Sequence, residues 1–216
     1  MKPVSACHLY TFVDTAYLRG RDPAEVARQL CDGGADLIQL RAKSSAPDEI
    51  LRLAGALLPV CEQAEVGLVI NDHPKLALQV GAPLCHLGQG DFFDAGFRTA
   101  AQVTGCPKQM LLGLSTHTPE QAQRALRAGP DYIAIGPVFA TATKPGRPAT
   151  TLDYVRWAAA NVTIPWFAIG GITLANLDEV LAAGARRVAV VSAILDAPDV
   201  VAACREFKRR LDAAAG

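Results

Sequence analysis

The feature that most constrains the fold is an order of apolar run, helical pattern and glycine that recurs along the whole chain. Eight apolar runs have the length of buried strands, and they cover residues 8–13, 36–40, 66–70, 84–87, 110–114, 131–135, 165–169 and 187–191. Glycines stand where a helix should end before the next strand, as at Gly34, Gly129 and Gly184. Strands that alternate with helices predict right-handed crossovers and a parallel sheet.

Eight such units in 216 residues predict an α/β fold, a single closed (β/α)8 TIM barrel that covers residues 1–216 as one domain. The alternative is an open, doubly wound sheet. That fold commonly has a Gly-x-Gly-x-x-Gly turn after its first strand, and none follows residues 8–13. Helix starts are expected at Asp22, followed by a proline, and at Thr118, which with Gln121 has the spacing of a capping box.

Composition excludes several classes of partner. Lys+Arg and Asp+Glu both number 21, so a formal net charge of +0 gives no reason to expect nucleic acid or an anionic membrane. No apolar run is long enough to span a bilayer, and the first residues lack the apolar stretch of a signal peptide. The six cysteines form no Cys-x-x-Cys pair, which disfavours a zinc site or a disulfide framework. We therefore expect a cytoplasmic protein that acts on small molecules, with its oligomeric state left open.

A cationic strand end follows the second predicted strand. Ile38 and Leu40 share one face, whereas Gln39, Arg41 and Lys43 share the other. Side chains of a barrel strand alternate between the lumen and the helix layer, so the polar face should point into the mouth of the barrel. Unpaired buried cations are costly, so an anionic ligand is expected there. The alternative is a solvated strand end that is paired with carboxylates of the protein itself.

Two carboxylates follow neighbouring strands. Asp72 comes after Asn71 at the end of the third strand, and Asp91 follows the fourth. Together they could hold Mg²⁺, which prefers oxygen ligands and shares its shell with substrate phosphates. Each aspartate could instead be a helix cap. His86 alternates into the lumen, where it could donate to a phosphate or be a core histidine with its hydrogen bonds satisfied.

The second half of the chain has loops suited to phosphorylated ligands. A loop over residues 136–148, with hydroxyls, a lysine and glycines, follows the sixth strand and could close over a ligand or be a plain surface loop. Gly170-Gly171 follows the seventh strand, and Val191-Ser192 ends the eighth. The loops after strands seven and eight are the usual phosphate cradle of such barrels.

In this order, the motifs resemble the thiamine phosphate synthase family. The resemblance extends from Leu9 to Ile194, and its most specific strings are Gln39-Leu40-Arg41-Ala42-Lys43, Ile70-Asn71-Asp72, His86-Leu87-Gly88-Gln89-Gly90-Asp91, Gly113-Leu114-Ser115-Thr116-His117, Gly136-Pro137-Val138-Phe139 with Thr141-Ala142-Thr143-Lys144, and Ile169-Gly170-Gly171-Ile172. This family joins a pyrimidinylmethyl diphosphate to a thiazole phosphate and releases pyrophosphate.

The resemblance implies a role for each matching residue. It places the diphosphate against Gln39, Arg41, Lys43, Asn71, His86 and Lys144, and Mg²⁺ on Asp72 and Asp91. It places Ser115 beside the pyrimidine, and the thiazole phosphate against Thr141, Thr143, Gly171, Val191 and Ser192. Arg41, Lys43, Ser115 and Lys144 are the residues expected to carry catalysis.

The chain departs from the family pattern at three places. Ala82-Pro83-Leu84-Cys85 replaces an Ala-Asp-Gly-Val run, Gly90 stands where an acid is usual, and Thr150-Thr151 stands where glycine is common. Two other functions are compatible with the barrel: a thiazole tautomerase that uses His117, and a non-catalytic barrel that binds thiamine precursors. The charges at Arg41, Lys43, Asp72, Asp91 and Lys144 favour the synthase.

Overall fold

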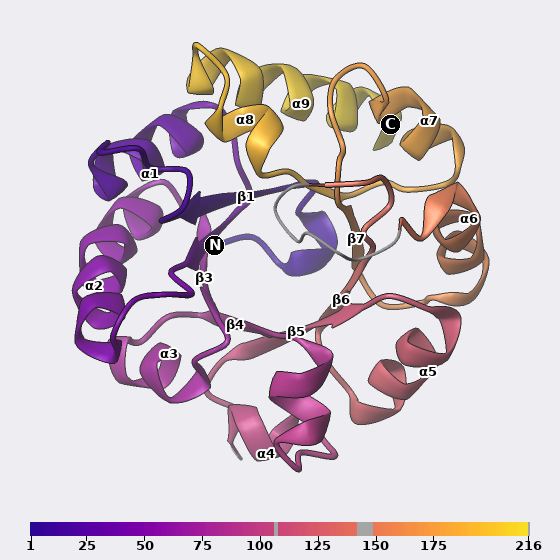
Figure 1. Cartoon of the computed structure of the whole chain (residues 1–216), viewed down its shortest axis with the longest axis horizontal. Helices are drawn as coiled ribbons and strands as arrows, with labels where there is room; N and C mark the ends of the chain where they lie inside the picture. Colours follow the sequence, from indigo (N-terminus) through magenta and orange to yellow (C-terminus); the bar gives the residue numbers. More distant parts are fainter. Residues whose placement is uncertain (106–107, 142–148, 216) are drawn as a thin grey trace.

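The computed structural model describes residues 1–105, 108–141 and 149–215. Its centre is a closed barrel of parallel strands in the order β1 to β8 (Figure 1). The strands are β1 (Leu9–Asp14), β2 (Leu37–Arg41), β3 (Gly67–Asn71), β4 (Leu84–Leu87), β5 (Leu111–Thr116), β6 (Tyr132–Ile135), β7 (Trp166–Ile169) and β8 (Val188–Ala189). The predicted TIM barrel is confirmed, and the open doubly wound sheet is excluded.

Helices surround the barrel on the outside (Figure 1). They are α1 (Pro23–Asp32), α2 (Pro47–Gln63), α3 (Pro74–Val80), α4 (Ala101–Thr104), α5 (Pro119–Ala128), α6 (Thr151–Asn161), α7 (Leu177–Ala182), α8 (Ser192–Leu195) and α9 (Val200–Ala215). A 3-10 turn, η1 (Val4–Ala6), precedes β1, and a short π-helix, η2 (Gly90–Asp94), follows β4.

The predicted helix boundaries have their expected chemistry. The Asp22 side chain accepts from the backbone N–H of Glu25, and the Thr118 hydroxyl accepts from that of Gln121. Gln121 does not complete a capping box, because its Oε1 accepts from the backbone N–H of His117 instead. Gly34, Gly129 and Gly184 have φ values of 86°, 74° and 102°, a left-handed conformation that favours glycine at a helix exit.

The eighth strand is much shorter than the sequence pattern predicts. The eighth apolar run covers residues 187–191, but β8 contains only Val188–Ala189. The backbone N–H of Val190 still donates to the carbonyl of Tyr10, and the chain then turns into α8 at Ser192. The ladder therefore ends early because Val191 leaves the extended conformation, with a ψ of −87°.

Aromatic side chains fill the lower lumen of the barrel. Tyr10 packs edge-on against Phe167 and Tyr132, with ring centroids 5.3 and 6.1 Å away, and it stacks on Phe12 at 5.2 Å. Tyr10, Tyr132 and Phe167 are fully buried. Tyr10 and Phe12 of this aromatic layer also line the cavity described below.

The N-terminal end of the barrel is closed by a clasp around Asp36. Figure 1 shows the N-terminal segment lying across the middle of the ring. The Asp36 carboxylate accepts from Lys2 Nζ at 2.6 Å, from Lys208 Nζ at 2.8 Å and from the backbone N–H groups of His8 and Leu9. Burial alone would raise the pKa of Asp36, but these donors outweigh it and lower that pKa.

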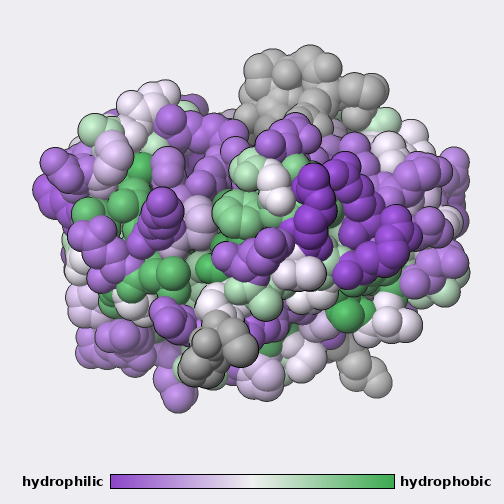
Figure 2. Space-filling view, turned by 90° about the horizontal axis from the view of Figure 1, so that it is seen from below, coloured by the Kyte–Doolittle hydropathy of each residue, from purple (hydrophilic) through white to green (hydrophobic). Residues whose placement is uncertain are grey.

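The outer surface is mostly polar. Hydrophilic side chains cover most of the face in Figure 2, with smaller apolar areas between them. Met1 and Leu78 are the large hydrophobic residues that are exposed within the described part of the chain. No helix in the described ranges is both long and apolar enough to cross a membrane.

Candidate active site

A polar cavity of about 320 Å³ opens where β2, β3 and β4 end. Its wall includes most of the residues that the sequence predicts for the diphosphate and metal, namely Gln39, Arg41, Lys43, Asn71, Asp72, His86 and Asp91, and also Ser115, which is predicted to lie beside the pyrimidine. The carboxyl ends of the strands therefore bring together side chains that are up to 76 residues apart in the sequence (115 − 39 = 76).

Arg41 is held by a carboxylate that the sequence reasoning missed. Its guanidinium donates to Asp14 Oδ2 at 2.6 Å, and the other Asp14 oxygen accepts from the backbone N–H of Ala16. The Asp14 side chain is 1% exposed and that of Arg41 is 14% exposed. Asp14 lies opposite Arg41 in the β1–β2 register, so the signal was a single acid at the end of the otherwise apolar first strand. Asp14 orients the guanidinium toward the cavity.

Asp72 and Asp91 lie near each other at the same rim. Burial raises the pKa of Asp72, the negative charge of Asp91 raises it further, and Lys43 and Asn71 partly offset the shift. Asp72 Oδ2 accepts from Asn71 Nδ2 at 2.6 Å and lies 3.5 Å from Lys43 Nζ. Asp72 also has a φ of +62°, an uncommon conformation for any residue with a side chain. Strain and raised pKa at one residue are typical of a functional site.

Neither aspartate is the helix cap of the alternative interpretation. The residue that precedes α3 is His73, which makes no side-chain cap bond. Asp91 lies inside η2, where its Oδ2 accepts from the backbone N–H of Gly88 at 3.2 Å. Across the described ranges, no group of three or more His, Cys, Asp and Glu side chains could enclose a metal. Two carboxylates at an open rim suit Mg²⁺, which completes its shell with water and substrate phosphate oxygens.

His86 has hydrogen bonds at both ring nitrogens. Nε2 lies 2.8 Å from Ser115 Oγ, and Nδ1 lies 3.2 Å from the hydroxyl of Tyr132. The side chain is buried, and it reaches the polar cavity beside Ser115. These bonds are those of a satisfied core histidine, and a direct contact of His86 with phosphate stays a prediction.

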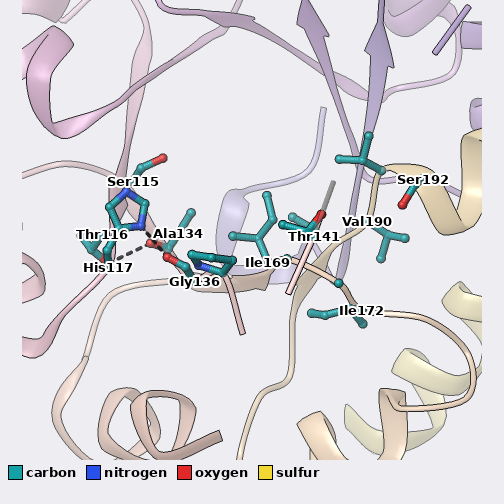
Figure 3. Close-up of a pocket in the computed structure, with 15 residues that line it drawn as sticks. Ser115, Thr116, His117, Ala134, Gly136, Thr141, Ile169, Ile172, Val190 and Ser192 are labelled. Atoms are coloured by element: carbon teal, nitrogen blue, oxygen red, sulfur yellow. Dashed lines mark hydrogen bonds between the residues drawn. The ribbon is translucent and has the colours of Figure 1, made fainter. Parts of the chain in front are cut away.

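A second pocket opens over β6, β7 and β8. Its wall is mainly apolar and glycine-rich, and it contains Ala134, Gly136, Pro137, Thr141, Ile169, Gly170, Gly171, Ile172, Val190, Val191 and Ser192. In Figure 3, Ser115 and His117 lie on one side of this pocket, with Val190 and Ser192 on the other. His117 Nδ1 donates to the carbonyl of Gly136 at 2.5 Å, which is the dashed line between them.

The two pockets share part of their walls. Six residues line both, and they are Ser115, His117, Ala134, Ile169, Ala189 and Val191. Gly171 gives the second pocket its close backbone approach, because a Cβ at this position would lie 2.6 Å from the carbonyl oxygen of Ala140. Two ligands could therefore lie side by side, one against the polar wall and one against the apolar wall.

The structure places the predicted residues in two groups. Gln39, Arg41, Lys43, Asn71, Asp72, His86 and Asp91 line the polar cavity, whereas Thr141, Gly171 and Ser192 line the second pocket. Ser115 and Val191 line both. Thr143 and Lys144 lie outside the described residues, so their predicted contacts stay predictions.

The fold and this site define a TIM barrel in which a pocket of charged and polar side chains adjoins a second, less polar pocket at the rim. The family model described as thiamine monophosphate synthase matches residues 9–194, and the chain belongs to this family. The expected family and the expected function, thiamine-phosphate synthesis by a transferase, are confirmed.

Individual relatives agree with this assignment. The chain is 49% identical to a thiamine-phosphate synthase of Thermus thermophilus over 83% of this chain and 84% of that protein. It is 46% identical to a thiamine-phosphate synthase of Acidothermus cellulolyticus over 96% of both proteins. The solved thiamine phosphate pyrophosphorylase of Pyrococcus furiosus superposes with a TM-score of 0.84 at 28% identity, over 97% of this chain and 98% of that one.

Proposed function

We propose that this chain synthesises thiamine phosphate with Mg²⁺ held by Asp72 and Asp91, and with its two substrates in the two adjoining pockets. The observation that carries the proposal is the shared wall between a pocket of cations and carboxylates and a pocket of apolar and glycine residues. A diphosphate matches the first pocket in charge, and a thiazole ring matches the second in polarity.

The polar wall suits the pyrimidinylmethyl diphosphate. Arg41, oriented by Asp14, and Lys43, whose side chain is 53% exposed, can both donate to phosphate oxygens. Gln39, Asn71 and Lys144 complete the proposed diphosphate site, and His86 lines it with both ring nitrogens already bonded to Ser115 and Tyr132. When bound, Mg²⁺ supplies positive charge that neutralises the departing pyrophosphate. Its two proposed ligands repel each other in the free protein, and a divalent cation would relieve that repulsion.

The second wall suits the thiazole phosphate. We assign its phosphate to Thr141, Thr143, Gly171, Val191 and Ser192, and the pyrimidine to the neighbourhood of Ser115. The bond between the methylene carbon and the diphosphate breaks and leaves a cation-like carbon, which the thiazole nitrogen then attacks. No proton has to be removed from the thiazole nitrogen, so the protein needs no general base. Positioning of two reactants can supply about 7–11 kcal/mol in favourable cases.

The test is turnover of both substrates as a function of Mg²⁺. We expect Asp91→Asn to raise the Mg²⁺ concentration needed for half-maximal turnover by about 10-fold or more, because one of two carboxylate ligands becomes neutral. Asp94→Asn is the matched control, because Asp94 is an exposed carboxylate on the same η2 helix that does not line either pocket.

Direct binding of thiazole phosphate to both variants separates the two pockets. Its affinity should stay unchanged in Asp91→Asn. Equal loss of Mg²⁺ response in both variants, or an unchanged response in Asp91→Asn, would contradict the metal assignment.

The five described cysteines are free thiols, which supports the expected reducing, cytoplasmic setting.

A further inference from the structure

A chain of hydrogen bonds crosses the lumen of the barrel beneath the polar cavity. Gln39 Nε2 donates to the hydroxyl of Tyr10 at 2.5 Å, and that hydroxyl lies 3.2 Å from the hydroxyl of Tyr132. Tyr132 in turn lies 3.2 Å from His86 Nδ1, and His86 Nε2 lies 2.8 Å from Ser115 Oγ. All five side chains are buried, and they come from β1, β2, β4, β5 and β6.

The donor at one end of the chain favours one direction for the bonds that follow. The Tyr10 hydroxyl accepts from the Gln39 amide, and among the described residues the hydroxyl of Tyr132 is the acceptor within reach of its own hydrogen, so we take Tyr10 to donate to Tyr132. Tyr132 then donates to His86 Nδ1. A neutral imidazole that accepts at Nδ1 carries its hydrogen on Nε2 and donates to Ser115. The Ser115 hydroxyl accepts this hydrogen bond from His86, so its own hydrogen can be donated to another group.

Both tyrosines hold their hydrogens firmly. Burial raises the pKa of Tyr10 and that of Tyr132, and the proximity of Tyr10 raises the latter further. With the phenol hydrogens in these places, the chain of bonds favours one tautomer of the His86 ring, with the hydrogen on Nε2.

The barrel makes special room for the central member. Gly113 on β5 faces the Tyr132 ring, and a Cβ at this position would lie 2.1 Å from Cζ and 2.5 Å from the hydroxyl oxygen. Any larger residue at position 113 would displace the phenol. The glycine of the Gly113-Leu114-Ser115 string thus admits Tyr132 to the lumen, two residues before the serine that ends the chain of bonds.

We infer that Tyr132 is a positioning residue, which sets the Nε2–H tautomer of His86 and so makes Ser115 a hydrogen-bond donor toward an acceptor in the cavity. Ring nitrogens of the aminopyrimidine are acceptors of that kind. This inference rests on the proposed function for the place of the pyrimidine, but the tautomer itself is a property of the free protein. It assigns Tyr132 a role without contact to substrate.

The tautomer is measured by ¹⁵N NMR of the histidine side chains in the full chain. The sequence has four histidines, and the His86 signals are identified by their loss in His86→Gln. We expect a proton-bearing shift at Nε2 and an unprotonated one at Nδ1. In Tyr132→Phe, Nδ1 loses its donor, so the two tautomers should become mixed.

Kinetics supply the functional measurement. Loss of a hydrogen-bond partner that orients a ligand of a metal site typically costs about 10- to 100-fold in activity, and we expect a loss of the same order in kcat for Tyr132→Phe, which acts on Ser115 through His86. Tyr154→Phe is the matched control, because Tyr154 is also buried and its hydroxyl bonds to Thr116 and Thr118 outside this chain. Its kcat should stay close to that of the native protein, because Tyr154 lines neither pocket.

A double variant separates positioning from packing. In His86→Gln the side-chain amide can donate toward Ser115 whatever Tyr132 does, so Tyr132→Phe should cost little further kcat in that background. An Nδ1–H tautomer in the native protein, or an unchanged tautomer in Tyr132→Phe, would overturn the inference. So would an undiminished kcat in Tyr132→Phe, even where Asp91→Asn upholds the proposed metal site. The opposite combination is also informative. If the native protein has the expected tautomer but Asp91→Asn responds to Mg²⁺ as the native protein does, the metal proposal is wrong and the inference about Tyr132 stands.

Discussion

Replacing Asp72 with asparagine should stabilise the metal-free protein while it removes the Mg²⁺ response. In the native chain Asp72 is partly buried beside Asp91, and both effects raise its pKa and so penalise its charged form. Its main compensating charge, Lys43, is 53% exposed at the side chain, and such a pair contributes about 0–1 kcal/mol. Asn also suits the left-handed backbone at this position, where φ is +62°.

The expected gain follows from these opposing contributions. Relief of repulsion and of buried charge should exceed the lost Lys43 pair, for a net gain of about 1 kcal/mol at pH 7, within the range usual for such substitutions. For a chain of this length that gain corresponds to a rise in Tm of about 2–4 °C. The Asn71 hydrogen bond can be kept, because an asparagine carbonyl accepts as a carboxylate does.

The pH dependence of Tm provides an independent check that Asp72→Asn stabilises the metal-free protein. A carboxyl whose folded pKa is raised penalises the folded state as pH increases above the unfolded value, about 3.9 for Asp. The penalty is complete once pH exceeds the raised pKa of Asp72. The Tm of the native protein and of Asp72→Asn should therefore converge below pH 3.9 and diverge toward pH 7.

The assay is thermal melting with EDTA and again with Mg²⁺, at both ends of this pH range. Mg²⁺ at 100 times its Kd stabilises a protein by about 2.7 kcal/mol, so it should reverse the order of the two Tm values at pH 7. Asp94→Asn again serves as the control. If Asp72→Asn melts lower than the native protein in EDTA at pH 7, the carboxylate is a structural partner of Lys43 and the reasoning is wrong.

Two further changes test other parts of the molecule. Asp36→Asn should lose about 3 kcal/mol of unfolding free energy at pH 7 by chemical denaturation, because the buried Asp36 carboxylate pairs with both Lys2 and Lys208, and Lys208 would keep only the exposed Asp212. Because the folded pKa of Asp36 is lowered, the native advantage is present above about pH 3.9 and disappears as pH falls through that lowered pKa; a constant difference would refute the clasp. Gly171→Ala should raise the KM for thiazole phosphate about tenfold, which is about 1.4 kcal/mol, by displacing the backbone against Ala140, without changing the Mg²⁺ requirement. An unchanged KM would show that the thiazole phosphate lies elsewhere.

The periodic part of the structure could be predicted from the sequence. Apolar runs, glycine exits and the caps at Asp22 and Thr118 are local signals, and each was found where expected. Strand ends were less predictable, because the β8 ladder ends where Val191 turns into a helix. The residues around position 191 carry no sequence signal that predicts this turn.

The sequence marks the charged residues of the candidate site, but not the residues that hold those side chains in place. Arg41 and Asp72 break an apolar pattern, so the sequence marks them. Asp14 and Tyr132 do not stand out in the same way, because an acid that ends a strand and an aromatic residue that begins one are common. Their roles depend on partners on other strands, Arg41 across the β1–β2 register and His86 across the lumen, and such pairings require the closed barrel.

The seam where β1 pairs with β8 closes the barrel, and its short ladder affects how the protein unfolds and aggregates. β1 pairs with β8 through only two Cα partners, Leu9↔Val188 and Tyr10↔Ala189, whereas β1 and β2 share five. A closed barrel has no strand edge, and that protection disappears when one of its two shortest ladders opens. Heating or loss of the Asp36 clasp would then expose the start of β1, at Leu9 and Tyr10, as a template for strands of other copies. The chain should therefore be lost to aggregation that begins at this seam, well before its helices melt.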